Sequence, residues 1–445
     1  MIDYTSLLRL GLDKYNIDCE KSYEIITPGT YNDIINVYFY KANKYLCPTC
    51  NSLNNKIIGS KVINVRYSLT SNNNISLILH RRKFKCLNCK SIFLENNPFS
   101  SNASNISYMT EINIMDEIRN PTNTFKDIAV KYSVSSTYVS TLFDRKFDSK
   151  RNNLSTVLSI DEIHSKKLSK SSYCCVLFDP INNLVIDILS SRRKDFLKYY
   201  FSHIPLNERL KVKYVSIDMW ESYKDITELY LPNAFICVDS FHVIKHLSDC
   251  FKVLRIRIMK KFSYLKKENN QLYWYFKSFW KLLMRDVNSS DYIYINRHKS
   301  YVSKGQIIDY MLSVSDELRL AYELKEDYRS FNRNIGYDPN ALLAQLNDLI
   351  YRFRESNIEE YKEFYKLLNH WKIEIVNSFI VYKNIRISNS RVERFNGKIR
   401  NLINVSFGLT NFIRFRNRVF YCFNKNTHML AFKKKENNQR HIKNK

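Results

Sequence analysis

Glycine and proline are scarce in this chain, with 7 and 8 residues among 445, whereas tyrosine occurs 32 times. We attribute this bias to nucleotide composition and not to function. No uncharged stretch approaches the length of a membrane span, and charges stand within the first dozen residues where a signal peptide would have its apolar core. These absences argue against a membrane protein and a secreted protein, and they predict a soluble, cytoplasmic chain with no membrane partner.

Acidic side chains are the minority charge: 43 Asp and Glu stand against 70 Lys and Arg, which gives a formal net charge of +27. Such an excess predicts a polyanionic partner, because basic side chains release counterions when they bind phosphates. A disordered polycation is excluded by the 44% hydrophobic and 14% aromatic content. The length allows two or three domains, each with a core of its own.

Four of the ten cysteines form two CxxC pairs, Cys47-Pro-Thr-Cys50 and Cys86-Leu-Asn-Cys89. Crowded thiolates in a reducing cell repel one another unless a cation holds them, so we predict a structural Zn²⁺. Short β-like stretches at 56–67 and 75–82 lie between the pairs and predict a zinc ribbon; the alternative is four free or redox-active thiols. The remaining six are predicted to be reduced core residues: Cys19, Cys174, Cys175, Cys237, Cys250 and Cys422. Basic residues crowd the second pair, where they face either phosphates or solvent: Arg81, Arg82, Lys83 and Lys85.

Residues 125–143 fit a helix-turn-helix, with apolar residues where two short helices cross, the small Ala129 at their approach, and Ser135 as a cap for the second helix. Ser133 occupies the turn position that glycine often takes. The exposed face of the second helix predicts contacts with DNA bases and phosphates. The residues on that face are Ser136, Thr137, Tyr138, Ser140 and Thr141. The alternative interpretation is an ordinary helical hairpin.

From residue 154 the pattern changes to strands, and it predicts a mixed α/β sheet. Strands are expected at 156–161, 173–178, 184–189, 212–218 and 234–238, with helices at 195–203 and 222–230. Residues 241–388 are helical in pattern, with no strand alternation, and an aromatic stripe at 273–280 is expected to pack in a core. The predicted division is 1–108 zinc-ribbon region, 109–150 helix-turn-helix, 151–242 first part of the catalytic core, 243–387 helical insertion, 388–432 last helices of the core, and 433–445 basic tail.

Two aspartates close predicted strands, Asp161 after Val157-Leu-Ser-Ile and Asp218 after Val215-Ser-Ile. Carboxylates at neighbouring strand ends repel each other, and Mg²⁺ relieves that repulsion while keeping water for chemistry. A third acid, Glu393, lies on a predicted helix, and three acids can hold two metals. The residues alone leave purely structural roles open. Either Asp can form a turn or cap a helix, and Glu393 can form a capping box with Ser390.

Five motifs resemble the bacterial insertion-sequence transposases of the ISL-three type. They are Ser159-Ile-Asp-Glu-Ile163, Ile217-Asp-Met-Trp220, Leu231-Pro-Asn-Ala-Phe235, Val238-Asp-Ser-Phe-His-Val243 and Ser388-Asn-Ser-Arg-Val-Glu393. The resemblance covers nearly the whole chain in the same order, although Trp220 stands where a small polar residue is more typical. It implies a multidomain α/β fold: an N-terminal zinc ribbon, a helix-turn-helix, and an RNase-H-like mixed α/β catalytic domain with a large all-helical insertion.

The resemblance also implies site residues. Asp161, Asp218 and Glu393 form the catalytic, metal-binding triad, in a sheet whose first and fourth strands are neighbours. Asp239 and His242 form an accessory DxxH motif that orients a phosphate or a carboxylate; His242 is alternatively a satisfied histidine at a helix start. Basic residues around Glu393 are expected to contact DNA: Arg391, Arg394, Lys398 and Arg400.

The implied activity is that of a DDE transposase, a polynucleotidyl transferase of mobile elements. Its expected cofactors are two Mg²⁺ per active site, with Mn²⁺ able to substitute, besides the structural Zn²⁺. Its expected partners are double-stranded DNA (terminal inverted repeats and target) and further copies of the chain, as a homodimer or higher oligomer in a synaptic, nucleoid-associated complex. Two alternatives stay open: a catalytically inactive, domesticated DNA-binding regulator, and a nuclease of the same fold that cuts without joining.

Overall fold

The computed structural model describes residues 1–25, 32–40, 45–68, 74–101, 104–169, 171–261, 271–406 and 409–424. The predicted basic tail at 433–445 lies outside the described residues. The chain divides into two units, one of Met1–Lys150 with Lys398–Lys445 and the other of Arg151–Gly397. None of the helices in the described ranges has both the length and the apolar character needed to cross a bilayer.

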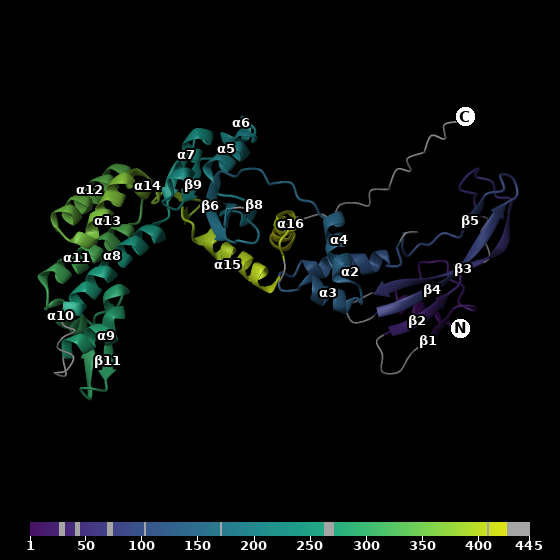
Figure 1. Cartoon of the computed structure of the whole chain (residues 1–445), viewed down its shortest axis with the longest axis horizontal. Helices are drawn as coiled ribbons and strands as arrows, with labels where there is room; N and C mark the ends of the chain where they lie inside the picture. Colours follow the sequence, from purple (N-terminus) through teal and green to yellow (C-terminus); the bar gives the residue numbers. More distant parts are fainter. Residues whose placement is uncertain are drawn as a thin grey trace. The chain divides into compact units, whose positions relative to one another are not determined.

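The first unit begins with a sheet built on a long hairpin (Figure 1). Its order is β1-β2-β4-β3, with β5 paired to β4. The strands are β1 (Tyr23–Ile25), β2 (Asn32–Val37), β3 (Asn55–Ser68), β4 (Asn74–Cys86) and β5 (Ile92–Leu94). The strands expected at 56–67 and 75–82 are confirmed as the antiparallel pair β3 and β4, whereas the sequence does not predict β1, β2 and β5. Helix α1 (Tyr4–Arg9) contributes Leu7 to a core shared with Ile35, Val65 and Leu77.

Apart from the second half of α15 (Ser390–Val405), four helices of the described ranges complete this unit: α2 (Tyr108–Ile118), α3 (Phe125–Lys131), α4 (Ser136–Lys146) and α16 (Phe412–Phe423). The sequence-based division groups residues 388–432 with the catalytic core, whereas α16 packs on the other three helices. The Tyr421 hydroxyl donates to the Met115 carbonyl at 3.1 Å, and its ring lies 4.8 Å from that of Phe147. Arg414 forms an ion pair with Asp144 on α4. The aromatic face of α16 therefore belongs to the helical core around α3 and α4.

The second unit is built on a five-stranded mixed sheet of order β10-β9-β6-β7-β8 (Figure 1). Its elements are β6 (Val157–His164), β7 (Tyr173–Asp179), β8 (Leu184–Leu189), α5 (Lys194–Ser202), α6 (Leu206–Arg209), β9 (Tyr214–Ile217), α7 (Glu221–Tyr230) and β10 (Phe235–Val238). The predicted alternation of strands and helices is confirmed, with the short α6 in addition. The first strand of this sheet, β6, pairs in parallel with the fourth, β9, as the resemblance implies.

The region between β10 and the Glu393 helix is mostly helical. It contains α8 (Ser240–Lys261), α9 (Gln271–Met284), α10 (Lys304–Leu312), α11 (Asp316–Asn332), α12 (Pro339–Glu355), η2 (Glu359–Tyr361), α13 (Lys362–His370) and α14 (Lys372–Asn377). On α9, Tyr275 and Phe276 are buried, and Trp274 and Phe279 pack against the same core, so the aromatic stripe is a core element as predicted.

The prediction of an all-helical insertion is wrong at two hairpins. Strands β11 (Tyr292–Ile295) and β12 (Ser300–Ser303) pair antiparallel, and so do β13 (Val381–Tyr382) and β14 (Ile385–Arg386). In the first, tyrosine and isoleucine favour a strand, and the rings of Tyr294 and Tyr301 lie 5.0 Å apart across the pair. Helix α15 (Ser390–Val405) follows the second hairpin.

Candidate functional site

Three aspartates form a row across the parallel strands β6, β9 and β10. The pairing at the strand ends sets Ser159 opposite Ser216, and Ile217 opposite Val238. Continuing both registers places Asp161, Asp218 and Asp239 side by side on one face of the sheet, because side chains alternate between faces along each strand. Asp161 does not close its strand as predicted, since β6 runs on to His164 alongside β7. It lies just beyond the last residue that β6 pairs with β9.

Burial and nearby negative charge raise the pKa values of the first two acids. Burial, and then the nearby charges of Asp218 and Glu393, raise the pKa of Asp161 to about 7. Burial, and then the charge of Glu162, raise the pKa of Asp218 to about 6. Burial likewise raises the pKa of Asp239. Carboxylates that resist ionisation in this way are expected where a divalent cation normally supplies the missing positive charge.

Glu393 lies in the first turn of α15, and its Oε1 is 3.5 Å from Nε2 of His242 on α8. Among the described residues, Asp239, His242 and Glu393 offer ligand atoms that all lie within 4.8 Å of one another. Asp161 and Asp218 do not join Glu393 in a group this tight, although the charge of Glu393 reaches Asp161. The structure therefore brings the predicted catalytic acids and the predicted accessory pair into one site.

Asn396 is a residue of this site that sequence analysis does not identify. It is fully buried, and its Nδ2 donates to Oδ2 of Asp161 at 2.7 Å. Its position three residues after Glu393 places it on the same face of α15. That spacing is a signal in the sequence, but it does not say which acid Asn396 contacts.

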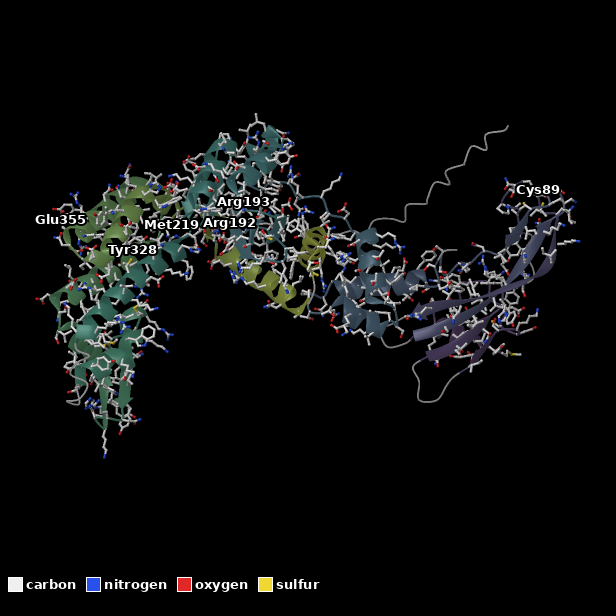
Figure 2. The ribbon with its side chains drawn as sticks, in the orientation of Figure 1. Cys89, Arg192, Arg193, Met219, Tyr328 and Glu355 are labelled. Carbon is white, nitrogen blue, oxygen red and sulfur yellow. The ribbon has the colours of Figure 1, made fainter. Side chains whose placement is uncertain are left out.

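Arg192 is a second residue that sequence analysis does not identify. Its guanidinium lies 4.0 Å from the ring centre of Tyr173 and 4.4 Å from that of Trp220, and it pairs with the Glu162 carboxylate. Arg192 and Met219, the residue after Asp218, are labelled in Figure 2. The unusual Trp220 thus holds a cation whose charge lowers the pKa of Asp218.

Several buried polar atoms in this site have no hydrogen-bond partner within the described ranges. They are Asp218 Oδ1, Asp239 Oδ2, the hydroxyl oxygens of Ser159 and Ser216, and the amide oxygens of Asn389 and Asn396. A buried carboxylate oxygen without a partner is costly unless a cation or water satisfies it. Hard oxygen ligands of this kind suit Mg²⁺ or Mn²⁺, so the residues present fit a divalent-metal site.

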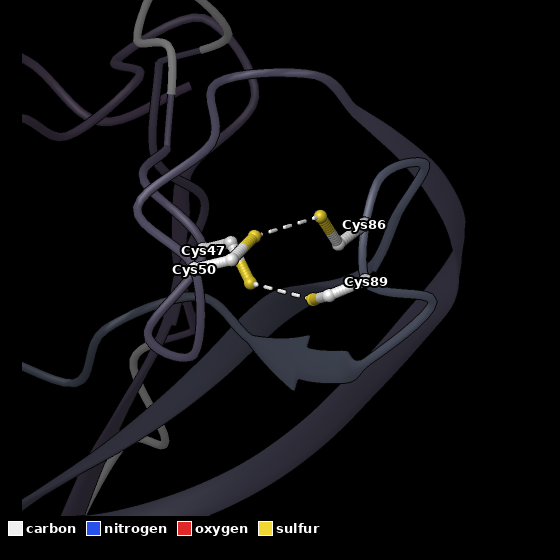
Figure 3. Close-up of side chains that lie close together, drawn as sticks. All are labelled: Cys47, Cys50, Cys86 and Cys89. Carbon is white, nitrogen blue, oxygen red and sulfur yellow. Dashed lines mark hydrogen bonds between the residues drawn. The ribbon is translucent and has the colours of Figure 1, made fainter.

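The four paired cysteines of the first unit form a second cluster (Figure 3). Their sulfur atoms lie within 4.8 Å of one another, with Cys47–Cys89 at 3.5 Å and Cys50–Cys86 at 3.6 Å. Tetrahedral zinc with bonds of about 2.3 Å requires sulfur–sulfur distances of about 3.8 Å. The cluster is therefore compatible with zinc held in a ribbon.

The two CxxC turns repeat the same backbone geometry. The Cys47 N–H donates to the Ser52 carbonyl and the Cys86 N–H to the Ser91 carbonyl, both at 2.9 Å. The residue after the second cysteine of each turn is left-handed, with φ of 54° at Asn51 and 61° at Lys90. The Ser91 hydroxyl, which contacts both thiols, lowers the pKa of Cys47 to about 5 and also lowers that of Cys89. Thiolates are the form that binds metal.

Basic side chains beside the second CxxC turn differ in whether they are free to contact phosphates or are engaged within the hairpin. Arg81 donates to the Glu95 carbonyl, and Arg82 pairs with the Glu95 carboxylate. Lys83 is exposed and Lys85 half-buried. The two arginines therefore stabilise the hairpin, and the lysines remain the candidates for phosphate contact.

Helices α3 and α4, joined by a short turn, span the residues predicted for a helix-turn-helix. Ser133 in the turn is left-handed with φ of 49°, which explains why glycine often stands there, and the Ser135 side chain caps α4 by accepting from the Tyr138 N–H at 3.0 Å. On the predicted DNA-contacting face, Ser136, Thr137 and Thr141 are exposed. The other two are engaged internally: the Tyr138 hydroxyl bonds Glu111, and the Ser140 hydroxyl bonds the Thr137 carbonyl.

A groove of about 720 Å³ runs beside the first turn of α4, lined among others by Ser136, Thr137, Ser140 and Arg414. The basic residues of α15 are divided between the two units. In the second unit, Arg391 is half-buried and donates to the Pro180 carbonyl, and Arg394 is exposed. Lys398 and Arg400 are exposed residues of the first unit.

The family model DDE_Tnp_ISL3, described as a transposase, matches residues 158–419, which is more than half of the chain. No curated protein matches the chain.

Proposed function

From the membership of this chain in the DDE_Tnp_ISL3 transposase family, we propose that it binds the terminal inverted repeats of an insertion sequence and catalyses metal-dependent DNA strand cleavage and strand transfer. The observation that carries this proposal is the row of Asp161, Asp218 and Asp239 on one sheet edge with Glu393 facing it. A DNA-binding regulator needs no such group of buried acids with raised pKa values.

The catalytic residues of this proposal are Asp161, Asp218 and Glu393, which hold two Mg²⁺ ions or Mn²⁺ in their place. When bound, the cations prepare a water or 3′-hydroxyl for attack and stabilise the leaving oxygen. The unpartnered Oδ1 of Asp218 supports this ligand role. The RNase-H-like assignment of the domain is supported by the sheet order with β6 beside β9.

Other side chains of the site act on these acids or on DNA. Asn396 donates a hydrogen bond to one oxygen of Asp161 and so orients the carboxylate. Arg192 offsets negative charge beside Asp218. The exposed Arg394, next to Glu393, and the half-buried Arg391 are placed to contact the phosphates of a bound strand, and Lys398 and Arg400 extend the basic series along α15.

The first unit is proposed to recognise DNA. Cys47, Cys50, Cys86 and Cys89 hold a structural Zn²⁺, and the exposed face of α4 reads the terminal repeats. The net charge of +27 supports a double-stranded DNA partner. Because two element ends must be joined to one target, we propose a homodimer or larger synaptic assembly.

Replacing Thr137 by glutamate is expected to weaken end binding by about tenfold or more, since a carboxylate on the reading face repels phosphates and a lost base contact costs about 1–3 kcal/mol. Electrophoretic mobility shift on terminal-repeat DNA measures this. The matched control, Thr5→Glu, makes the same change at an exposed position of α1 and should leave the affinity for terminal-repeat DNA unchanged. If Thr137→Glu bound terminal-repeat DNA as tightly as the parent chain does, α4 would not be part of the DNA interface.

The proposal as a whole is tested by incubating the full chain and Mg²⁺ with a pre-cleaved element end and a target plasmid. A joined product is expected, because an activated 3′-hydroxyl attacks the target directly. Cutting of the plasmid without joining would identify a nuclease of the same fold. End binding with neither cutting nor joining would identify a regulator.

A further inference from the structure

The accessory pair Asp239 and His242 lies directly beside Glu393. Asp239 follows β10, His242 lies in the first turn of α8, and Glu393 lies in the first turn of α15. Ligand atoms of all three lie within 4.8 Å of one another. His242 and Glu393 are separated by about 150 residues of sequence, so the fold brings them together.

The His242–Glu393 contact has the spacing of two ligands of one ion. Nε2 and Oε1 are 3.5 Å apart, whereas a charge-assisted hydrogen bond is typically about 2.7–2.9 Å. Two donors that each lie about 2.1 Å from one cation are about 3.0–3.4 Å apart, for octahedral and tetrahedral angles respectively. The observed gap lies just beyond this range, and a small inward movement of either side chain brings it to the value that a shared octahedral cation requires.

Asp239 supplies an independent observation. The whole residue is 2% exposed, and Oδ2 has no hydrogen-bond partner among the described residues. The backbone N–H groups of Asn389 and Phe241 lie close enough to the carboxylate to favour its charged form. A buried carboxylate oxygen without a partner is available as a ligand.

We infer that Asp239, His242 and Glu393 together bind one of the two divalent cations of the proposed active site, and that Asp161 and Asp218 hold the other. This inference rests on the proposed function for its setting, and it extends the acidic triad to a five-residue ligand set. The side chains of His242 and Glu393 are 30% and 35% exposed. Solvent, or a phosphate oxygen of DNA, can thus complete the coordination, as in a catalytic metal site and not a closed structural one.

The nitrogen ligand predicts a metal preference. Mn²⁺ shares with Mg²⁺ a preference for carboxylate and water ligands, but as a transition-metal ion it accepts an imidazole nitrogen more readily than Mg²⁺ does. The cation held by His242 is therefore expected to select Mn²⁺ over Mg²⁺, and the cation held by the two aspartates is expected to discriminate less.

The test uses the full zinc-containing chain, without DNA, titrated with Mn²⁺ and studied by pulsed electron paramagnetic resonance. Nitrogen modulation from an imidazole bound to Mn²⁺ is expected in the parent chain and is expected to disappear in His242→Gln. The affinity of that site should fall by about tenfold or more. The matched control is His246→Gln, one turn further along α8 and exposed, which should keep the modulation. Circular dichroism and thermal melting verify that each variant is folded.

Two further variants separate the ligand sets. Asp161→Asn should retain the nitrogen modulation while losing the other bound Mn²⁺, and Asp239→Asn should weaken the nitrogen-coupled ion. Absence of modulation in the parent chain, or its persistence in His242→Gln, overturns the inference. Because these measurements need neither DNA nor catalysis, a chain that shows the modulation but joins no strands refutes the proposed function alone, and the opposite result refutes the metal ligands alone.

Discussion

Replacing Asp161 by asparagine is expected to abolish strand cleavage and strand transfer while leaving the binding of element ends unchanged. The amide has the size of the carboxylate but no charge, so the hydrogen-bonding position beside Asn396 remains filled while the ligand is lost. Metal ligands supply several kcal/mol of charge stabilisation in the transition state. A loss of about 4 kcal/mol corresponds to a rate reduction of roughly a thousandfold.

Single-turnover cleavage and joining of labelled element ends measure the effect, with mobility shift as the assay of binding. Asp225→Asn is the matched control, because Asp225 is a half-buried acid of the same unit that pairs with Lys194 on α5. It should cleave and join at the parental rate. If Asp161→Asn cleaved within a factor of about ten of the parent chain, equivalent to about 1.4 kcal/mol, Asp161 would not be a ligand of the reacting cations.

The strands and their acids were predictable from sequence because they depend on local pattern. Asp161 and Asp218 each follow a short apolar segment with a serine two residues earlier, and both serines lie on the face of their acid. That Asp239 joins the row is a matter of register: β10 pairs with β9 so that Val238 meets Ile217. No single segment contains that information.

Contacts of this site between distant segments could not be predicted for the same reason. Asn396 reaches Asp161 across 235 positions of the chain. Arg192 is held between Tyr173 and Trp220, which come from different elements. Trp220 looks like a departure from the family pattern in the sequence, and only its stacking on Arg192 shows what it does.

In the first unit, the sequence pattern predicted the cysteine cluster and the two helices of the helix-turn-helix, but not β2 and α16, which pack beside them. Strand β2 joins the hairpin by pairing in parallel with β4, an arrangement that depends on pairing between distant segments. Helix α16 follows the Glu393 helix in the chain, so proximity in sequence assigns it to the catalytic core. Its aromatic face nevertheless meets Met115 and Phe147.

Removing zinc, by chelation or by Cys86→Ser, is expected to unfold the cysteine end of the β3–β4 hairpin and to abolish specific end binding. The apolar core of this sheet includes Val65 and Leu79, and towards the cysteines side chains such as Ile57, Val62 and Ile92 are exposed. So little apolar burial cannot hold two turns together, and the metal must contribute the folding energy there. The second unit has its own core and should stay folded.

Zinc release measured with a chromogenic chelator, together with hydrogen exchange of residues 45–68 and 74–95, reports both events. Cys86→Ser should contain almost no zinc, exchange rapidly in these residues and bind ends at least about tenfold more weakly, a loss of roughly 1.4 kcal/mol or more. Cys19→Ser, at a half-buried cysteine of the same unit outside the cluster, should match the parent chain in all three measurements. A Cys86→Ser chain with slow exchange and full affinity would show that hydrogen bonds of the two CxxC turns suffice without metal. That outcome is disfavoured because the Ser91 hydroxyl lowers the pKa of Cys47 to about 5 and also lowers the pKa of Cys89, and thiolates this close repel each other unless a cation lies between them.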